Sequence, residues 1–164
     1  MAIVYFDSSA FVKLLVEEVG SEMAAALWDG CDAAISSRLA YPEVRSALAA
    51  AGRDRRLDAE AQRHAEVAWE EYWAATRSVE LSESVTAHAG ELAGQHALAG
   101  ADAVHLASAL AVGVDEIVLA AWDRRLRSGA ETAGVQLAPA PQCFVRAAQP
   151  GRLATVHGDS AGQS

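Results

Sequence analysis

Residues 3–15, IVYFDSSAFVKLL, contain the change of pattern that decides the class of fold. The first four residues are apolar and either β-branched or aromatic, which predicts a short buried strand. Asp7 ends this strand, and residues 8–18 follow as a predicted helix with Ser8 or Ser9 available as its N-cap. We therefore expect a strand that passes directly into a helix, with a carboxylate at the junction.

The same alternation of strand and helix continues along the chain. It predicts an α/β fold with a mostly parallel central sheet that helices cover on both faces. Residues 1–148 form the predicted domain, and residues 149–164, which are small, polar and without periodicity, are expected to be a disordered tail. Further strands are predicted at 33–37, 78–81, 116–122 and 135–141, and helices at 21–29 (capped by Ser21), 41–52, 58–75, 82–98, 100–113 and 124–134.

Composition limits the class of protein. The 164 residues are 52% hydrophobic and 21% charged, which suits one globular domain with a sizeable core. No uninterrupted apolar run reaches the length of a membrane span, and the N-terminal segment lacks the basic leader of a signal peptide. Cys31 and Cys143 lack metal-ligand spacing, so we expect a cytoplasmic protein with free thiols, a bridge between them being the alternative.

The formal charge of −9 argues against a general nucleic-acid coat, because phosphate binding relies on clustered Lys and Arg. It leaves room for an enzyme that reaches phosphate through a bound cation. Lys13 is the only lysine, and the arginines cluster at 53–56 and 124–127. Arginine binds phosphate in a bidentate way. A solvated helix face is the alternative interpretation of either cluster.

Acidic side chains occur at matching points of the predicted elements. Asp7 follows the strand at 3–6, and Asp123 follows the strand at 116–122, so both are expected at the same edge of a parallel sheet. Asp102 opens the apolar helix GADAVHLASAL (100–110), and Glu43 lies in the first turn of another helix. Taken alone, Asp102 reads as a helix cap. Four carboxylates in equivalent places suggest one common site.

Converging carboxylates repel one another in a partly buried site, and a hard divalent cation compensates them. Mg²⁺ or Mn²⁺ prefers such oxygen ligands, lowers the pKa of a bound water and binds a phosphodiester. No Cys and His set suits zinc, and His105 is expected in the core or in support of the site. The alternative is that each acid is a separate cap or loop residue.

Four segments in this order, VYFDSSAFVKLLVEE, YPEVRSAL, GADAVHLASAL and WDRRL, resemble the acidic motifs of PIN-domain nucleases, and in particular VapC-type toxins of bacterial toxin–antitoxin modules. The resemblance spans about residues 1–140. It implies an α/β/α sandwich and a Mg²⁺-dependent endoribonuclease that hydrolyses RNA phosphodiester bonds. The metal-site acids that it carries over are Asp7, Glu43, Asp102 and Asp123.

The resemblance also implies roles for these residues. Asp7 and Asp102 are the main Mg²⁺ anchors, Asp123 completes the cluster, and Glu43 holds a second ion or orients the attacking water. Ser9 matches a hydroxyl-bearing contact near the first acid.

Two further positions bear on the site. Ala121 stands where family members often have Ser or Thr, which puts one positioning hydroxyl in doubt. Arg124 and Arg125 directly follow Asp123 and are expected to steer the RNA backbone, surface salt pairing being the alternative.

Membership of such a module implies a small antitoxin with a DNA-binding part, and a homodimeric toxin. Candidate contact surfaces are the helix at 11–15 and the apolar stripe Val67, Trp69, Tyr72 and Trp73. Ordinary core packing is the alternative for most of these residues.

Two other functions compete with the nuclease. Aspartyl-phosphate phosphatases also place Asp at a strand end, but they use a Lys near the site and a second Asp two residues later. Here Lys13 is expected away from any later strand end, and Ser9 replaces the second Asp. The remaining alternative is a PIN-like binding module that is weakly catalytic or inactive.

Overall fold

The computed structural model describes residues 2–113, 115 and 117–140. Within them a single parallel sheet of five strands has the order β3-β2-β1-β4-β5. The central strand begins four residues before Asp7, as predicted from its apolar pattern. The strands are β1 (Ile3–Phe6), β2 (Ala33–Ser37), β3 (Arg77–Val79), β4 (Ile117–Ala120) and β5 (Gln136–Ala138).

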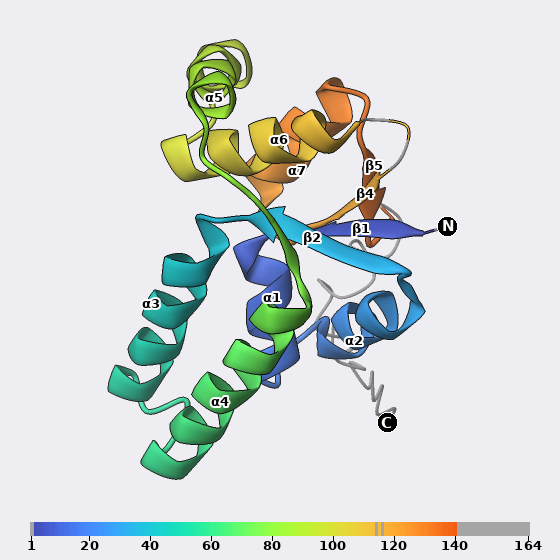
Figure 1. The fold of residues 1–164 in the computed structure, drawn as a ribbon. Helices are drawn as coiled ribbons and strands as arrows, with labels where there is room; N and C mark the ends of the chain where they lie inside the picture. The colour runs from blue at the N-terminus through green and yellow to red at the C-terminus, as the bar shows by residue number, and fades with distance from the viewer. Residues whose placement is uncertain (1, 114, 116, 141–164) are drawn as a thin grey trace, which may run out of the picture.

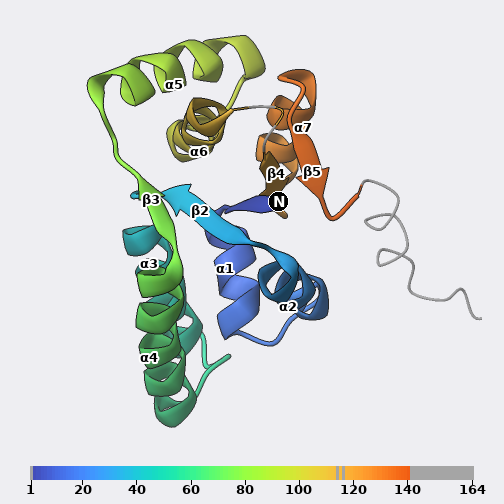
Figure 2. The same ribbon diagram turned by 45° about the vertical axis from the view of Figure 1, so that its right-hand side comes forward.

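Helices cover both faces of the sheet and make three layers. Figure 1 shows α5, α6 and α7 on one side of the sheet and α1 to α4 on the other, and the turned view in Figure 2 agrees. The α/β/α sandwich predicted from the sequence is therefore confirmed. The helices are α1 (Ser8–Leu15), α2 (Ser21–Gly30), α3 (Ala40–Arg53), α4 (Ala59–Ala75), α5 (Glu83–His96), α6 (Gly100–Val112) and α7 (Arg124–Thr132).

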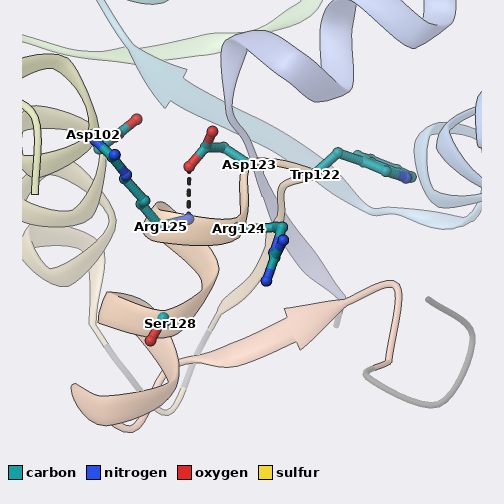
Figure 3. A pocket seen from close by; sticks show the side chains of 6 residues that line it. All are labelled: Asp102, Trp122, Asp123, Arg124, Arg125 and Ser128. Atoms are coloured by element: carbon teal, nitrogen blue, oxygen red, sulfur yellow. Dashed lines mark hydrogen bonds between the residues drawn. The ribbon is translucent and has the colours of Figure 1, made fainter. Parts of the chain in front are cut away.

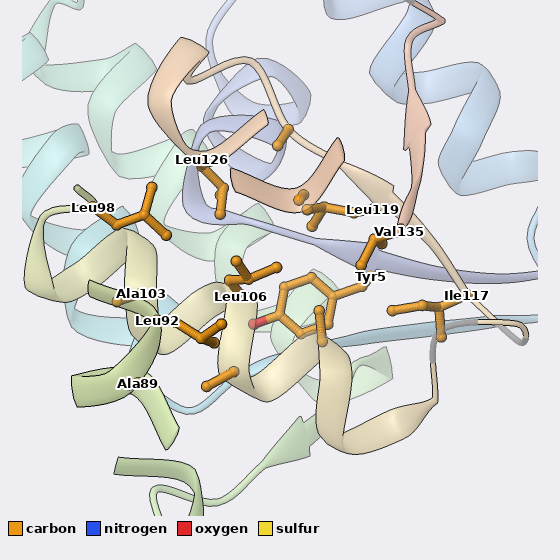
Figure 4. Packing of buried hydrophobic residues seen from close by; sticks show 14 of the residues in the cluster. Tyr5, Ala89, Leu92, Leu98, Ala103, Leu106, Ile117, Leu119, Leu126 and Val135 are labelled. Carbon is orange, nitrogen blue, oxygen red and sulfur yellow. The ribbon is translucent and has the colours of Figure 1, made fainter. Parts of the chain in front are cut away.

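Strand β1 is apolar throughout because both of its faces are buried. Successive side chains of a strand point to opposite faces. Val4 and Phe6 accordingly pack against α1 to α4, whereas Tyr5 packs against α5 to α7. Figure 4 shows Tyr5 among Leu92 and Leu106 of this second core.

The connections around β1 create a crevice. Residues that follow β1 cover one face of the sheet, and those that follow β4 cover the other, so the strand order reverses between these two neighbours. In open α/β sheets, ligands bind outside the carboxyl ends of the strands at this point. The backbone N–H of Asp7 donates to the carbonyl of Ala120 at 3.1 Å, which joins the two strand ends there.

Several predicted boundaries need correction. Helix α1 is capped by Asp7, whose carboxylate accepts from the N–H of Ala10, and not by Ser8 or Ser9. Helix α2 has Gly20 as its N-cap, with φ of 99°, and the Ser21 hydroxyl instead donates to the carbonyl of Val16. A side chain at position 20 would have to enter the Trp122 indole, because a Cβ there would lie 2.6 Å from Nε1.

The ends of two elements also differ from expectation. Helix α1 ends at Leu15, three residues before the predicted end at residue 18. Strand β4 ends at Ala120, so Asp123 follows the strand after a short loop instead of directly. The predicted tail at 149–164 and Cys143 lie outside the described residues, while Cys31 is a free thiol. No helix in the described part of the chain combines the length and apolar character needed to cross a membrane.

The core beneath α6 sets the first prediction. Leu106 is fully buried, so Leu106→Ala leaves a cavity and should lower the free energy of unfolding by about 2–5 kcal/mol. Val67 is 61% exposed, and Val67→Ala should change stability by less than about 0.5 kcal/mol. Urea denaturation checks both variants. Equal midpoints would show that α6 does not pack as described.

Candidate active site

Asp7 lies at the end of the central strand, where its carboxylate is almost completely buried. The side chain is 4% exposed, and it accepts hydrogen bonds from the Ser9 hydroxyl at 2.7 and 2.9 Å and from the Ala10 N–H at 2.8 Å. Burial raises the pKa of Asp7 to about 6, and the negative charge of Glu43 acts in the same direction. The charge of His105 and the hydrogen bonds from Ser9 and Ala10 only partly oppose this rise in pKa.

Ser9 connects the ends of two strands. Its hydroxyl donates to Asp7 and accepts from the backbone N–H of Trp122 at 2.9 Å. Trp122 belongs to the loop between β4 and α7, so this one side chain fixes the loop against the start of α1. Ser9 therefore contacts the first candidate acid, the position that the family resemblance implies for it.

Asp123 begins the next helix at the same edge of the sheet. It is the N-cap of α7, and its Oδ1 accepts from the N–H groups of Arg125 at 2.8 Å and Leu126 at 3.1 Å. Figure 3 shows the bond to Arg125 as a dashed line. Asp123 and Asp7 are thus both helix caps: Asp7 directly follows β1, and Asp123 follows β4 after a short loop.

Asp102 lies in the first turn of α6 but does not cap that helix. The N-cap is Ala99, and no side-chain bond caps this end. Burial raises the pKa of Asp102, as do the charges of Asp123 and Glu43, while Arg125 opposes them. The interpretation of Asp102 as a simple helix cap is therefore wrong. Its pKa is set by burial and by the charges of neighbouring side chains.

A surface pocket of about 680 Å³ connects two of the acids. Figure 3 shows Asp102 and Asp123 facing the same space, with Arg125 beside them. The indole of Trp122 points away from the two acids. The pocket is lined by Asp102, Trp122, Asp123, Arg124, Arg125 and Ser128.

Glu43 reaches the site from the first turn of α3. Its Oε2 accepts from the Ser8 hydroxyl and interacts with His105 Nε2 at 2.7 Å. Burial alone would raise the pKa of Glu43, but the hydrogen bond and charge of His105 and the bond from Ser8 outweigh it. The pKa of Glu43 is consequently lowered, and this carboxylate is ionised at neutral pH.

His105 occupies the supporting position expected from the sequence. It is 3% exposed, and its Nδ1 lies 3.0 Å from the hydroxyl of Tyr5. The bonds that join Tyr5, Ser8 and Glu43 to His105 were not predicted. The spacing of His105, three residues after Asp102, was the available signal, because such residues share one helix face.

The four predicted acids lie in one electrostatic neighbourhood. Asp7 responds to the charge of Glu43, and Asp102 responds to the charges of Glu43 and Asp123. Among the residues that the structure describes, however, no three His, Cys, Asp or Glu side chains lie close enough to hold a metal ion. The acids are therefore gathered at one edge without forming a closed ligand set.

The two arginine clusters have different surroundings. Arg124 and Arg125 are exposed and line the pocket, as their predicted role requires. Arg127 points inward instead and donates to the carbonyls of Ala121 at 2.8 Å and Pro139 at 2.7 Å. Arginines 53, 55 and 56 are exposed at the far end of α3, consistent with a solvated face.

Lys13 lies closer to the end of β4 than its position in the sequence suggested. Its ammonium lies 5.4 Å from the centre of the ring of Trp122, a residue that follows the end of β4 by two positions. It donates there to Glu18 at 2.7 Å and to the carbonyl of Val19 at 2.8 Å. Lys13 is thus held by the α1–α2 loop and makes no hydrogen bond to Asp7, which argues against the phosphatase alternative.

The aromatic stripe of α4 is mainly core. Trp69 is fully buried against Phe11, with 5.0 Å between the ring centres. Tyr72 and Trp73 are partly buried in the same core. Val67 is exposed, so it is the one member of this stripe that faces outward.

Comparisons with known proteins identify the family. The PIN domain family matches residues 4–131. Ribonuclease VapC45 and ribonuclease VapC49, from two strains of Mycobacterium tuberculosis, are each 65% identical to this chain over 140 residues. Each alignment covers 85% of this chain and 97% of the relative.

Solved structures share the fold at low sequence identity. The M. tuberculosis toxin VapC20, described as cleaving the sarcin–ricin loop, matches with a TM-score of 0.59 and 19% identity over 80% of this chain and 95% of its own. A toxin–antitoxin complex from Klebsiella pneumoniae matches with a TM-score of 0.57 and 18% identity over 82% of this chain and 95% of its own. The fold and its acidic edge define a PIN domain. The chain belongs to this family and, within it, to the VapC ribonucleases.

The buried charge of Asp7 gives a prediction about stability and pH. Its pKa is about 6 in the folded chain and about 3.9 in an unfolded one, so the folded state binds more protons between these values. Stability conferred by the protonated carboxyl is therefore lost as pH rises from about 4 to 6. Asp7→Asn removes the ionisation and keeps a capping oxygen, so it should exceed wild type by about 1–3 kcal/mol at pH 7.5.

Urea denaturation from pH 4 to pH 8 in the presence of a chelator measures this difference. Glu80→Gln is the control, because Glu80 is exposed and pairs with Arg38 on the surface. This control should follow the wild-type pH dependence. A wild-type protein that becomes more stable between pH 4 and 6, relative to Asp7→Asn, would contradict the buried charge.

Proposed function

We propose that the protein is a divalent-metal-dependent endoribonuclease and the toxin of a toxin–antitoxin module. The observation that carries this proposal is the buried carboxylate of Asp7 at the crevice between β1 and β4. The charge of Glu43 acts on both Asp7 and Asp102, and that of Asp123 acts on Asp102. A crevice at the carboxyl ends of parallel strands is where α/β proteins bind their ligands.

The donor set fits a hard cation. All four side chains offer carboxylate oxygens, which Mg²⁺ and Mn²⁺ prefer. Burial and neighbouring negative charge raise the pKa values of Asp7 and Asp102, and a cation would relieve this repulsion. Mg²⁺ keeps several waters and needs only one or two protein carboxylates, so a closed ligand set is not required.

We assign Asp7 and Asp102 as the main metal anchors and Asp123 as the acid that completes the cluster directly or through water. When bound, the cation supplies a water of lowered pKa and neutralises charge on the phosphodiester. Ser9 holds the carboxylate of Asp7 in place through its hydroxyl.

Glu43 and the arginines act on the remaining parts of the reaction. Glu43 is ionised and holds a second ion or accepts a hydrogen bond from the attacking water, which aligns that water with the phosphorus. Arg124 and Arg125 bind phosphates of the RNA backbone on either side of the cleaved bond.

The proposed partner is a small antitoxin with a DNA-binding part, which covers the site of a cytoplasmic, homodimeric toxin. Support for the module comes from the two 65% identical VapC ribonucleases. Candidate contact residues are Val67, which is exposed, and the neighbourhood of α1, where Val19 is 76% exposed.

A binding module without catalysis is the second candidate. It is favoured by the absence, among the described residues, of three side chains close enough to hold an ion. Ala121 adds to it, because this residue is fully buried and offers no hydroxyl near Asp123. RNA cleavage distinguishes the two candidates.

The first test is cleavage of total bacterial RNA by the purified protein with Mg²⁺ or Mn²⁺, followed by sequencing of the new RNA ends. Asp7→Asn and Asp102→Asn should each lower the rate by at least about 100-fold, because each removes a ligand from the charge-stabilising site. The control Glu80→Gln should cleave like wild type, and a chelator should stop all cleavage. No cleavage by wild type, or equal cleavage by Asp7→Asn, would support the binding module.

A second test concerns the exposed arginines. Replacing Arg124 and Arg125 together by Gln should weaken RNA binding at all sequences. The slope of the logarithm of the binding constant against the logarithm of salt concentration should fall by the equivalent of about one to two phosphate contacts. The double variant Arg53→Gln/Arg55→Gln removes the same charge at the far end of α3 and serves as the control. Equal weakening by both pairs would mean that the arginines act only through net charge.

A further inference from the structure

We propose that His105 is a positioning residue for Glu43, and that Tyr5 selects the imidazole tautomer in which it works. The inference rests on the ribonuclease function proposed above. The observation behind it is an unbroken series of hydrogen bonds that runs from the backbone of β2, through the buried side chains of Tyr5 and His105, to the carboxylate on α3.

The series has three steps. The backbone N–H of Ser37 donates to the hydroxyl of Tyr5 at 3.0 Å, and that hydroxyl lies 3.0 Å from His105 Nδ1. His105 Nε2 lies 2.7 Å from Oε2 of Glu43. Tyr5 is fully buried and His105 nearly so, and Figure 4 shows the Tyr5 ring packed inside the core. Water therefore does not compete for the two bonds of the Tyr5 hydroxyl, whereas the bond to Glu43 is partly buried.

The chemistry of the two ends sets the direction of the series. The backbone N–H of Ser37 can only donate, so the Tyr5 oxygen accepts at that side. An ionised carboxylate can only accept, so His105 Nε2 carries the proton that reaches Glu43. In a neutral ring Nδ1 then carries no proton and accepts a hydrogen bond from the Tyr5 hydroxyl, which also lies within reach of the Ser108 hydroxyl.

The series joins the three elements that hold the site. Tyr5 lies in β1 two residues before Asp7, Glu43 lies in the first turn of α3, and His105 lies one turn after Asp102 in α6. Hydrogen bonds that fix one group relative to its neighbours in this way are typical of residues that orient metal-site ligands. His105 thus sets the position of Glu43 relative to Asp102.

These hydrogen bonds also determine which carboxylate oxygen of Glu43 stays available to bind an ion or a water. Both His105 and Ser8 reach Oε2. Oε1 has no hydrogen-bond partner among the described residues, so it is the oxygen that can meet an ion or a water. Rotation of the carboxylate would exchange the two oxygens, and the paired bonds to Oε2 oppose it.

Kinetics of the full-length protein with Mg²⁺ and a defined RNA test the role. His105→Leu should lower kcat by about 10–100-fold with KM unchanged, because His105 does not touch the RNA. His105→Gln, whose amide can donate to Glu43, should recover most of that loss. Tyr5→Phe keeps the ring but removes the hydroxyl, and it should lower kcat less than His105→Leu.

Leu106→Val is the matched control for damage to packing. It trims a fully buried neighbour on the same helix without touching the series of bonds, so it should keep the wild-type kcat. Urea denaturation of all four variants verifies that each is folded at the assay temperature. A loss of kcat in Leu106→Val as large as that in His105→Leu would overturn the positioning role.

Nitrogen-15 NMR of the imidazole rings tests the tautomer without metal, RNA or activity. The His105 signals are identified by their disappearance in His105→Gln. In the neutral form of the ring they should show a proton on Nε2 and a bare Nδ1, and Tyr5→Phe should change this pattern. A neutral ring that carries its proton on Nδ1 would overturn the role of Tyr5.

The two measurements separate this inference from the proposed function. If wild type cleaves no RNA, the proposed function fails while the tautomer is still read from the NMR spectrum. If wild type cleaves RNA and His105→Leu cleaves equally well, the positioning role alone fails. Equal losses in His105→Gln and His105→Leu would also overturn it.

Discussion

The burial of one ionisable carboxylate, that of Asp7, is the constraint on which the rest of the structure depends. The central strand places this group at the crevice where the strand order reverses, and the helix that follows partly compensates its burial through the N–H of Ala10 and the hydroxyl of Ser9. The compensation is incomplete, because the pKa stays raised at about 6. A fold selected for stability alone has no reason to keep such a group. A requirement to bind a cation at this position would be a reason to keep the buried carboxylate.

The other elements are arranged around that point. The loop after β4 is attached to it through the bond from Trp122 to Ser9, and α7 then begins at Asp123. Asp7 and Asp123 are caps and candidate ligands at once. A cap uses a lone pair of one oxygen and leaves the carboxylate its negative charge, so the two interpretations that compete in the sequence are compatible in the structure.

The architecture was predictable because its signals are local. Strand β1 is apolar on both faces, the strands alternate with helices, and parallel strands bring Asp7 and Asp123 to one edge. Element ends were less predictable: Ser8, Ser9 and Asp7 are equally good caps by type, and only the backbone geometry favours Asp7. The links between Tyr5, His105 and Glu43 could not be predicted, because they join residues 62 and 100 positions apart that no periodicity relates. The burial of the Arg127 side chain could not be predicted for the same reason, because residues 124–127 look uniformly exposed in the sequence.

The most direct test of the account is the anomalous diffraction of crystals soaked in Mn²⁺. We expect a manganese peak in the crevice between β1 and β4, within coordinating distance of a carboxylate oxygen of Asp7, and loss of this peak in Asp7→Asn. Manganese that occupies the crystals only at other carboxylates, with none at Asp7, would contradict the claim that this buried acid exists to hold a cation.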